Sequence, residues 1–185
     1  MVYILLGSGF EDMEALAAAD VLRRANLPVS LAGIGGDTVT SSHSVTVRAD
    51  LPVEAVTLEE GDMVVLPGGL GGVSSIEGSE AAMALIRQAM GDDRLWVAAI
   101  CAAPTLLARA GLIGPGTYAV CYPGMEGELS AAGAIPVMDR SVVTQGKLVT
   151  GRAPGSAFDF GLALVEVLSG TAAADQVRAG LHYAP

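Results

Sequence analysis

The first 34 residues, MVYILLGSGFEDMEALAAADVLRRANLPVSLAGI, hold the pattern that decides the fold class. Val2 to Leu6 is a short apolar run bounded by a glycine turn, as in a buried strand. Glu11 to Ala25 then carries apolar residues at helical spacing, with acidic residues in its first turn. Pro28 ends the helical segment, and Val29 to Ile34 has the pattern of a second strand. The stretch therefore predicts a strand–helix–strand unit with parallel strands.

The same alternation continues along the rest of the chain. It predicts an α/β fold with a doubly wound, mostly parallel sheet, helices on both faces, and ligands at the carboxyl ends of the strands. A small side hairpin is expected from Ser44–Val47 and Leu51–Val53, and a glycine-rich loop at Pro67–Gly72. The other expected strands are Met63–Leu66, Trp96–Ile100, Tyr118–Val120, Ser141–Thr144 and Lys147–Thr150, and the other expected helices are Ser79–Met90, Pro104–Ala110 and Pro154–Leu168.

Length and composition indicate one domain over residues 1–185. No linker or charge block divides the 185 residues, and 24 glycines with few aromatic residues suit tightly packed layers joined by short turns. The two cysteines are interpreted as free thiols rather than a disulfide framework. The cysteines and histidines lie too far apart in sequence for zinc-type spacing, so no metal is expected.

The formal net charge of −10 argues against partners that need a positive field. Basic residues are scattered singly, which disfavours nucleic acid and anionic membranes. The N-terminus has no basic segment of the signal-peptide type, and no apolar stretch is long enough to span a bilayer. We therefore expect a cytoplasmic protein.

Cys101 is the strongest catalytic candidate, because it directly follows a predicted strand. Pro104 suits the first turn of a helix, so Cys101 is expected at a strand-to-helix corner. There the positive end of the helix dipole can lower a thiol pKa from about 8.5 to roughly 3.5–7.5. The alternative role is that of a small buried apolar residue. Cys121, in or just past a strand, is assigned that second role.

Glu14 is the candidate partner of this thiol. It lies where the inward face of the first helix begins, whereas Glu11 and Asp12 are expected to be solvated first-turn residues. The helix leaves the carboxyl end of the first strand, which brings Glu14 toward the sheet edge that holds Cys101. A dinucleotide loop is disfavoured, because Asp12 replaces the third glycine of that motif and the acidic pair would repel a pyrophosphate.

Five ordered motifs connect the chain with a known family. Together they resemble the ThiJ/PfpI superfamily from the first strand to the last helix, most closely the branch of the parkinsonism-linked protein DJ-one. The resemblance implies a flavodoxin-like fold, a homodimer, and a nucleophilic cysteine hydrogen-bonded to a protonated glutamate. The motifs are GFEDME at 9–14, LRRA at 22–25, VVLPGG at 64–69, AICAAP at 99–104 and GRAPG at 151–155.

The resemblance assigns roles to particular residues. Cys101 and Glu14 match the nucleophile and the acid. Gly68 and Gly69 match the loop that lines the family's oxyanion site, where the N–H of Ala102 is the other donor.

Two further residues, Arg24 and Pro154, are supporting members of the matched motifs. The implied homodimer would bury the second face of the first helix near Arg24. That residue would then help to place Glu14 or contribute to the partner's pocket.

Three departures from the family pattern narrow the function. Family members with protease-like triads carry a histidine directly after the cysteine, where this chain has Ala102, so no peptidase activity is expected. The closer branch often has a pocket histidine in the region of Tyr118 to Arg140, and this chain has none there. His43 stands where close relatives tend to have an arginine; His43 and His182 are expected to be structural or exposed.

The leading hypothesis is cofactor-independent chemistry on 2-oxoaldehydes such as methylglyoxal, as a glyoxalase III, or on glycated thiols and amines, as a deglycase. The second is a redox sensor or stress chaperone in which Cys101 is oxidised to sulfinate. The third, a thiazole-biosynthesis-type or amidotransferase-like role, is disfavoured by the missing histidine.

Overall fold

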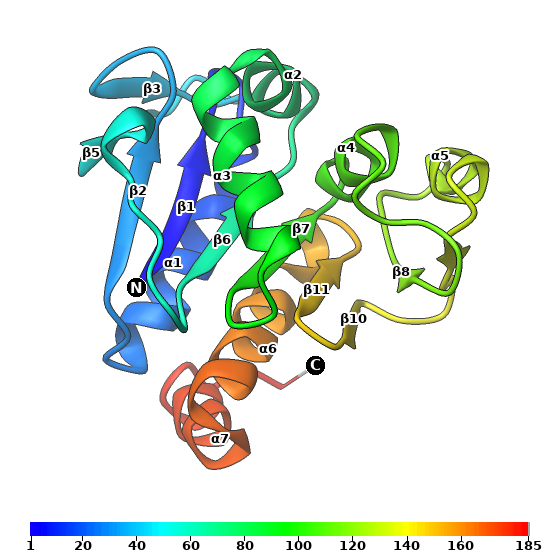
Figure 1. Cartoon of the computed structure of the whole chain (residues 1–185). Helices are drawn as coiled ribbons and strands as arrows, with labels where there is room; N and C mark the ends of the chain where they lie inside the picture. The colour runs from blue at the N-terminus through cyan, green and yellow to red at the C-terminus, as the bar shows by residue number, and fades with distance from the viewer. Residues whose placement is uncertain (185) are drawn as a thin grey trace.

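A seven-stranded sheet forms the centre of the computed structural model, which describes residues 1–184 (Figure 1). Its strands are β1 (Val2–Leu6), β2 (Val29–Gly33), β5 (Leu51–Pro52), β6 (Met63–Leu66), β7 (Trp96–Ile100), β10 (Val142–Gln145) and β11 (Leu148–Gly151). The spatial order is β10-β11-β7-β6-β1-β2-β5, and every neighbouring pair is parallel except β10 with β11. The predicted doubly wound, mostly parallel sheet is therefore confirmed.

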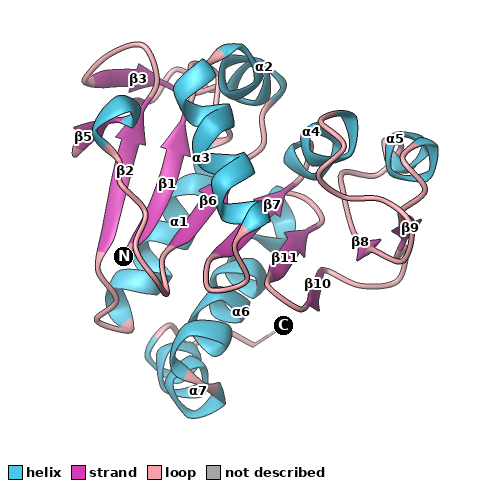
Figure 2. Ribbon diagram, viewed as in Figure 1, coloured by secondary structure: helices cyan, strands magenta, loops and turns pink. Residues whose placement is uncertain are grey.

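Helices cover both faces of this sheet, as Figure 2 shows. One face carries α2 (Leu70–Gly78), α3 (Glu80–Gly91) and α4 (Ala103–Arg109), and the other carries α1 (Asp12–Arg24) and α6 (Ala157–Ser169), with α7 (Thr171–Gly180) packed on α6. Alternate strand residues supply the two cores: Val64 faces α3, whereas Val65 faces α1 and α6. None of the helices within residues 1–184 has the length and hydropathy needed to cross a bilayer.

Small residues let α1 and α6 approach closely behind the sheet. A Cβ added to Gly161 of α6 would lie 3.0 Å from Cβ of Val21, so this crossing has no room for a larger side chain. Ala15 and Ala18 of α1 are fully buried on the same side. This packing fixes the rotation of α1 and, with it, the direction of the side chains in its first turns.

The helix α2 is a correction to the sequence prediction, which placed a loop at Pro67–Gly72. Glycines at positions 71 and 72 favoured a loop because glycine is a weak helix former. In the structure they serve packing instead: a Cβ on Gly72 would lie 2.6 Å from the Phe10 Cα. The glycines therefore allow α2 to rest directly on the loop that follows β1.

The side hairpin also differs from the prediction. It is formed by β3 (Thr38–Thr40) and β4 (Thr46–Arg48), which pair antiparallel. Leu51, expected in the hairpin, instead pairs with Ala32 and extends the main sheet as β5. A hairpin needs its strands to face each other across a short turn, and residues 41–45 supply that turn.

A small lobe after α4 was only partly predicted. The expected strand at Tyr118–Val120 is present as β8 (Tyr118–Ala119), but it pairs with β9 (Ile135–Pro136) in a separate two-stranded sheet. The helix α5 (Glu126–Ala131) lies between them in sequence and was not predicted, nor was α7.

Candidate active site

The carboxyl ends of four parallel strands meet at one edge of the sheet. β1 has β2 on one side and β6 on the other, so the chain order reverses there and opens a crevice outside the strand ends. Hydrogen bonds join the loops across this edge. The N–H of Cys101 donates to the Gly151 carbonyl (2.9 Å), and the N–H of Glu11 donates to the Gly68 carbonyl (3.0 Å).

Cys101 occupies a strained turn between β7 and α4. Its φ of 66° lies in the left-handed region, which non-glycine residues seldom adopt and which is frequent at functional sites. The residue exposes only 7% of its surface and belongs to the core that α1 and α6 share with the sheet. The turn thus directs the thiol toward the first turn of α1.

Glu14 meets the thiol from α1. The residue is fully buried, and its Oε2 accepts a 2.7 Å hydrogen bond from the N–H of Gly68. Its other oxygen, Oε1, is buried without a hydrogen-bond partner among residues 1–184. A carboxyl group that carries a proton becomes a hydrogen-bond donor as well as an acceptor.

Gly68 shows how close the two side chains lie. A Cβ at this position would be 2.6 Å from Cβ of Cys101, 2.6 Å from Oε2 of Glu14 and 2.9 Å from Sγ. Such distances are well below van der Waals contact, so only glycine fits between the carboxyl and the thiol.

Burial raises the pKa of the Glu14 carboxyl to about 7. Hydrogen bonds from Cys101 and from the Gly68 N–H oppose this shift, and the negative charge of Glu11 adds to it. Glu14 therefore exchanges its proton near neutral pH, which an exposed glutamate does not.

The pKa of the Cys101 thiol is raised to about 12, first by burial and then by the Glu14 carboxylate. The predicted lowering by a helix terminus is therefore wrong. α4 begins at Ala103, has seven residues, and leaves Cys101 outside its first turn. The N–H groups of Gly69 and Ala102 do favour the thiolate, but burial outweighs them. Because one cause is the Glu14 charge, a thiolate and a protonated Glu14 favour each other.

The three N–H groups that were predicted as oxyanion donors act on two different side chains, Cys101 and Glu14. The N–H groups of Gly69 and Ala102 lower the pKa of the Cys101 thiol, whereas the N–H of Gly68 donates to Glu14. Gly69 adopts φ +81°, and a Cβ there would lie 2.4 Å from the Gly9 carbonyl oxygen. Its lack of a side chain lets this loop lie against residues 9–11, between β1 and α1.

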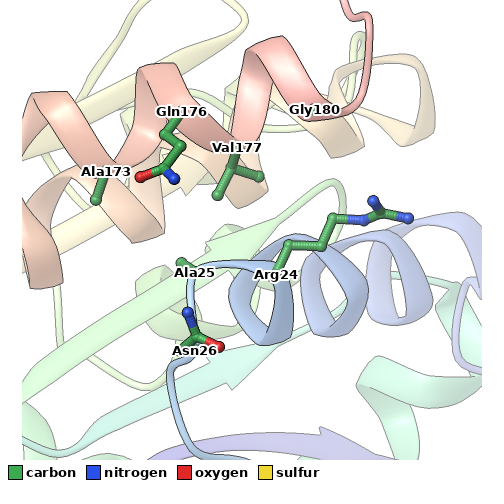
Figure 3. Close-up of a pocket in the computed structure, with 7 residues that line it drawn as sticks. All are labelled: Arg24, Ala25, Asn26, Ala173, Gln176, Val177 and Gly180. Carbon is green, nitrogen blue, oxygen red and sulfur yellow. The ribbon is translucent and has the colours of Figure 1, made fainter.

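Arg24 lies away from the pair, at the far end of α1. Arg24 lies ten residues after Glu14 on α1, about 15 Å along the axis, and pairs with Asp20 at 2.6 Å. Figure 3 shows it beside a cavity of about 300 Å³ between α1 and α7. Its role in a partner's pocket stays a prediction. Pro154 begins a short 3₁₀ helix (Pro154–Ser156) after β11.

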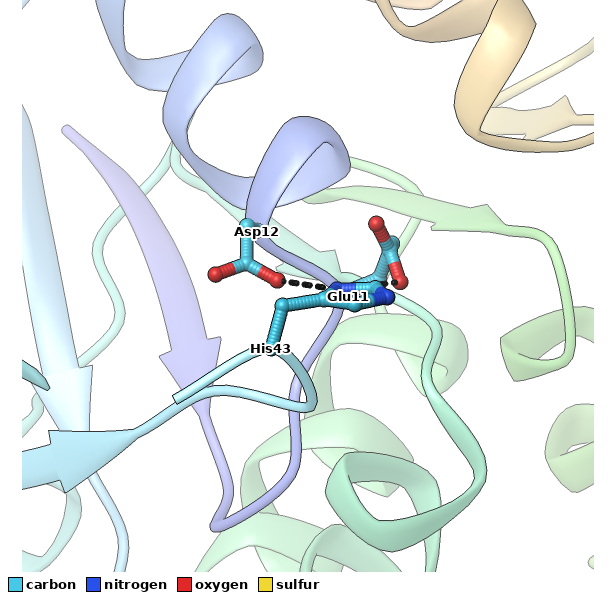
Figure 4. A group of neighbouring side chains, drawn as sticks. All are labelled: Glu11, Asp12 and His43. Carbon is cyan, nitrogen blue, oxygen red and sulfur yellow. Dashed lines mark hydrogen bonds and ion pairs between the residues drawn. The ribbon is translucent and has the colours of Figure 1, made fainter. Parts of the chain in front are cut away.

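Three residues expected to be solvated or structural gather beside this site. Glu11 is 9% exposed, and His43 Nδ1 lies 2.7 Å from Asp12 Oδ2 (Figure 4). No local motif reveals this group, because the turn between β3 and β4 carries His43 to α1 from 31 residues away.

The backbone beside the second cysteine, Cys121, contacts Cys101, but the two side chains belong to different cores. The N–H of Tyr122 donates to the Cys101 carbonyl at 2.8 Å. Cys121 itself is 2% exposed and belongs to the core on the opposite face of the sheet, with α3 and α4. The prediction that Cys121 is structural agrees with this placement.

The fold and the pair of Cys101 and Glu14 define a flavodoxin-like α/β protein with a cysteine at a strand-to-helix corner. Residues 1–167 match the DJ-1/PfpI family, and the chain belongs to that family, in its DJ-1 branch. Protein dj-1beta of Drosophila melanogaster is 40% identical over 179 residues, covering 96% of this chain and 94% of that protein.

Solved structures and a further relative agree with this assignment. The crystal structure of Drosophila dj-1beta superposes with a TM-score of 0.90 at 37% identity, covering 100% of this chain and 98% of that one. The DJ-1 of Toxoplasma gondii, solved in an oxidized form, has a TM-score of 0.89 at 30% identity, with 100% and 98% covered. A deglycase of Pyrococcus horikoshii is 30% identical over 167 residues, 90% of this chain and 98% of that protein.

Proposed function

We propose that the protein is a cofactor-independent enzyme that acts on small 2-oxoaldehydes such as methylglyoxal, or on their early adducts with amines and thiols. The observation that carries the proposal is the buried pair, in which a carboxyl with a pKa of about 7 lies beside a thiol. A group that titrates near neutral pH can both accept and return a proton. The relative named as a deglycase supports the same class of substrate.

Glu14 accepts the thiol proton as the sulfur of Cys101 adds to the aldehyde carbon, and passes it to the aldehyde oxygen. The product is a hemithioacetal. Glu14 then removes the hydrogen from the former aldehyde carbon and delivers it to the adjacent keto carbon, while the hydroxyl proton moves to the keto oxygen. The first carbon is thereby oxidised to a thioester and the second reduced to an alcohol. Hydrolysis by water releases lactate and restores the thiol.

The backbone around the pair supports these steps. The N–H groups of Gly69 and Ala102 stabilise negative charge on the sulfur when it attacks and when it leaves the thioester. The N–H of Gly68 holds one oxygen of Glu14, which leaves the other oxygen to move protons.

The limited exposure of the thiol favours small substrates. Cys101 exposes 7% of its surface, so a three-carbon aldehyde reaches the sulfur more readily than a sugar adduct on a folded protein. Within the proposed class, free methylglyoxal is therefore the preferred substrate over bulky glycated side chains.

The test is incubation of the purified protein with methylglyoxal, followed by detection of lactate on a chiral column. Steady multiple turnover in the protein and none in Cys101→Ser supports the proposal. Cys121→Ser is the matched control and should retain full turnover, because that thiol lies on the opposite face of the sheet. Failure to form lactate at high protein concentration would exclude the enzyme.

A second candidate is a redox sensor, in which Cys101 is oxidised and no turnover is required. The oxidized form of the Toxoplasma relative favours it. A protonated Glu14 would donate a hydrogen bond to an oxygen added to the sulfur. Stoichiometric oxidation without lactate formation would select this function over the enzyme.

A further inference from the structure

A second group of chemically active side chains lies at the start of α1, outside the Cys101 pair. It consists of Glu11, Asp12 and His43, and Figure 4 shows the histidine ring with the two carboxylates turned toward it. Nδ1 of His43 is 2.7 Å from Asp12 Oδ2 and 3.7 Å from Glu11 Oε2. One potential ligand atom from each residue thus lies within 4.8 Å of the others.

Backbone hydrogen bonds hold the three residues in this arrangement. The turn that carries His43 is fastened to the segment before α1: the N–H of Ser42 donates to the Phe10 carbonyl (2.9 Å), and the N–H of Gly9 donates to the Thr40 carbonyl (2.8 Å). The backbone of the turn that carries His43 is therefore held against the segment before α1.

The two carboxylates are largely shielded from solvent and share a single basic side chain. Their side chains expose only 12% (Glu11) and 14% (Asp12). Within residues 1–184, His43 is the sole basic side chain within 4.0 Å of either one. The Ser41 hydroxyl, which donates to Asp12 Oδ1, and the positive end of the α1 dipole compensate part of this negative charge, and a divalent cation would balance both carboxylates.

Glu11 also has an unused oxygen. Among the described residues, hydrogen bonds reach only its Oε2, which accepts from the Ser42 hydroxyl at 3.2 Å. Oε1 makes none within the described residues and is accessible to solvent, so it is open to a ligand. A carboxylate with an accessible free oxygen beside a ring nitrogen can accept a cation.

We propose that Glu11, Asp12 and His43 form a binding site for a divalent transition-metal ion of the zinc class. Carboxylate oxygen and imidazole nitrogen bind such ions at about 2.0–2.2 Å, so bound ligands lie roughly 3–4 Å apart. The present separations need only small side-chain movements to reach that geometry. The imidazole binds as the neutral tautomer through Nδ1, with its hydrogen on the solvent-facing Nε2.

The donor set also discriminates between metals. Calcium and magnesium prefer oxygen ligands alone, whereas an imidazole nitrogen favours zinc, cobalt, nickel or copper. The thiols do not belong to the site, which is independent of the proposed chemistry at Cys101.

The experiment is calorimetric titration of the metal-free full chain with Zn²⁺, with Co²⁺ used as a spectroscopic probe. We expect one saturable site, and Co²⁺ spectra without a thiolate charge-transfer band. His43→Ala should weaken binding about 10-fold or more. This side chain is 68% exposed, so its removal leaves the core intact. His182→Ala removes the other histidine of the chain and is the matched control; it should bind as the unchanged protein does.

Several results would overturn the proposal. Absence of saturable Zn²⁺ or Co²⁺ binding would do so, as would equal affinity in His43→Ala and in the unchanged protein. A thiolate charge-transfer band that disappears in Cys101→Ser would assign the metal to the thiol. Equal binding of Mg²⁺ and Zn²⁺ would indicate a general attraction of cations to the carboxylates.

Discussion

The N–H of Gly68 donates a 2.7 Å hydrogen bond to Glu14 Oε2 at a point where no side chain fits between Glu14 and Cys101. We predict that Gly68→Ala separates the pair, because its Cβ would lie 2.6 Å from Cβ of Cys101. Overpacking of this kind costs about 1–3 kcal/mol. Urea unfolding should show the loss of stability, and lactate formation should fall with it.

The control is Gly127→Ala, at a position in α5 with no atom within 4 Å of an added Cβ. It should leave turnover unchanged and stability equal or slightly higher, since alanine is the better helix former. Wild-type stability and turnover in Gly68→Ala would show that the loop moves freely and does not hold the pair.

Glu14→Gln should change two properties in opposite directions. Lactate formation should fall by roughly 10²- to 10⁴-fold, because the amide keeps the shape but cannot exchange a proton. Alkylation of Cys101 at about pH 8 should become faster, because the carboxylate charge that helps to raise the thiol pKa is gone. Iodoacetamide kinetics measure the second effect. A fall in both rates would indicate a distorted site rather than a lost proton shuttle.

The raised pKa of Glu14 also predicts how stability depends on pH. Between pH 4.5 and about 7 the folded state binds more protons than the unfolded state, so raising the pH through this window favours unfolding. Glu14 thus lowers the free energy of unfolding by up to about 3 kcal/mol above the window, relative to below it. Urea unfolding at about pH 4.5 and about pH 8 tests this.

Glu14→Gln is the reference in that experiment, because it cannot titrate while all other groups do. The difference in stability between the variant and the unchanged protein should shift in favour of the variant as the pH rises. A difference that stays constant with pH would mean that Glu14 has an ordinary pKa in the folded protein.

The sequence could predict which residues meet, but not their electrostatics. Cys101 follows β7 and Glu14 lies in the helix after β1, and these two parallel strands, with β6 between them, end at the same edge of the sheet. The sequence could not predict that the pKa of the Cys101 thiol is raised, because this shift depends on burial and on the strained turn. Local sequence patterns could not predict the contact of His43 with Asp12 either, because 31 residues separate the two.

The exposed face of α1 predicts a two-fold homodimer. Met13 is 54% exposed and Leu16 36% exposed, one turn apart on that face. Large apolar residues gathered on one surface favour association. Sedimentation at micromolar concentration should show a dimer, and Met13→Asp should dissociate it. Met138→Asp is the control, because Met138 is equally exposed (56%) but lies outside α1. A monomer in the unchanged protein would contradict the prediction.

Cys101 should be oxidised by mild peroxide to the sulfinate rather than to a disulfide. The two cysteines belong to cores on opposite faces of the sheet, whereas a disulfide needs Cβ atoms about 3.5–4.5 Å apart. A protonated Glu14 can also donate a hydrogen bond to the added oxygen. Peptide mass mapping should therefore find two oxygens on Cys101, and the same in Cys121→Ser. Oxygens on Cys121 with Cys101 still reduced would show that the corner thiol is only a core residue.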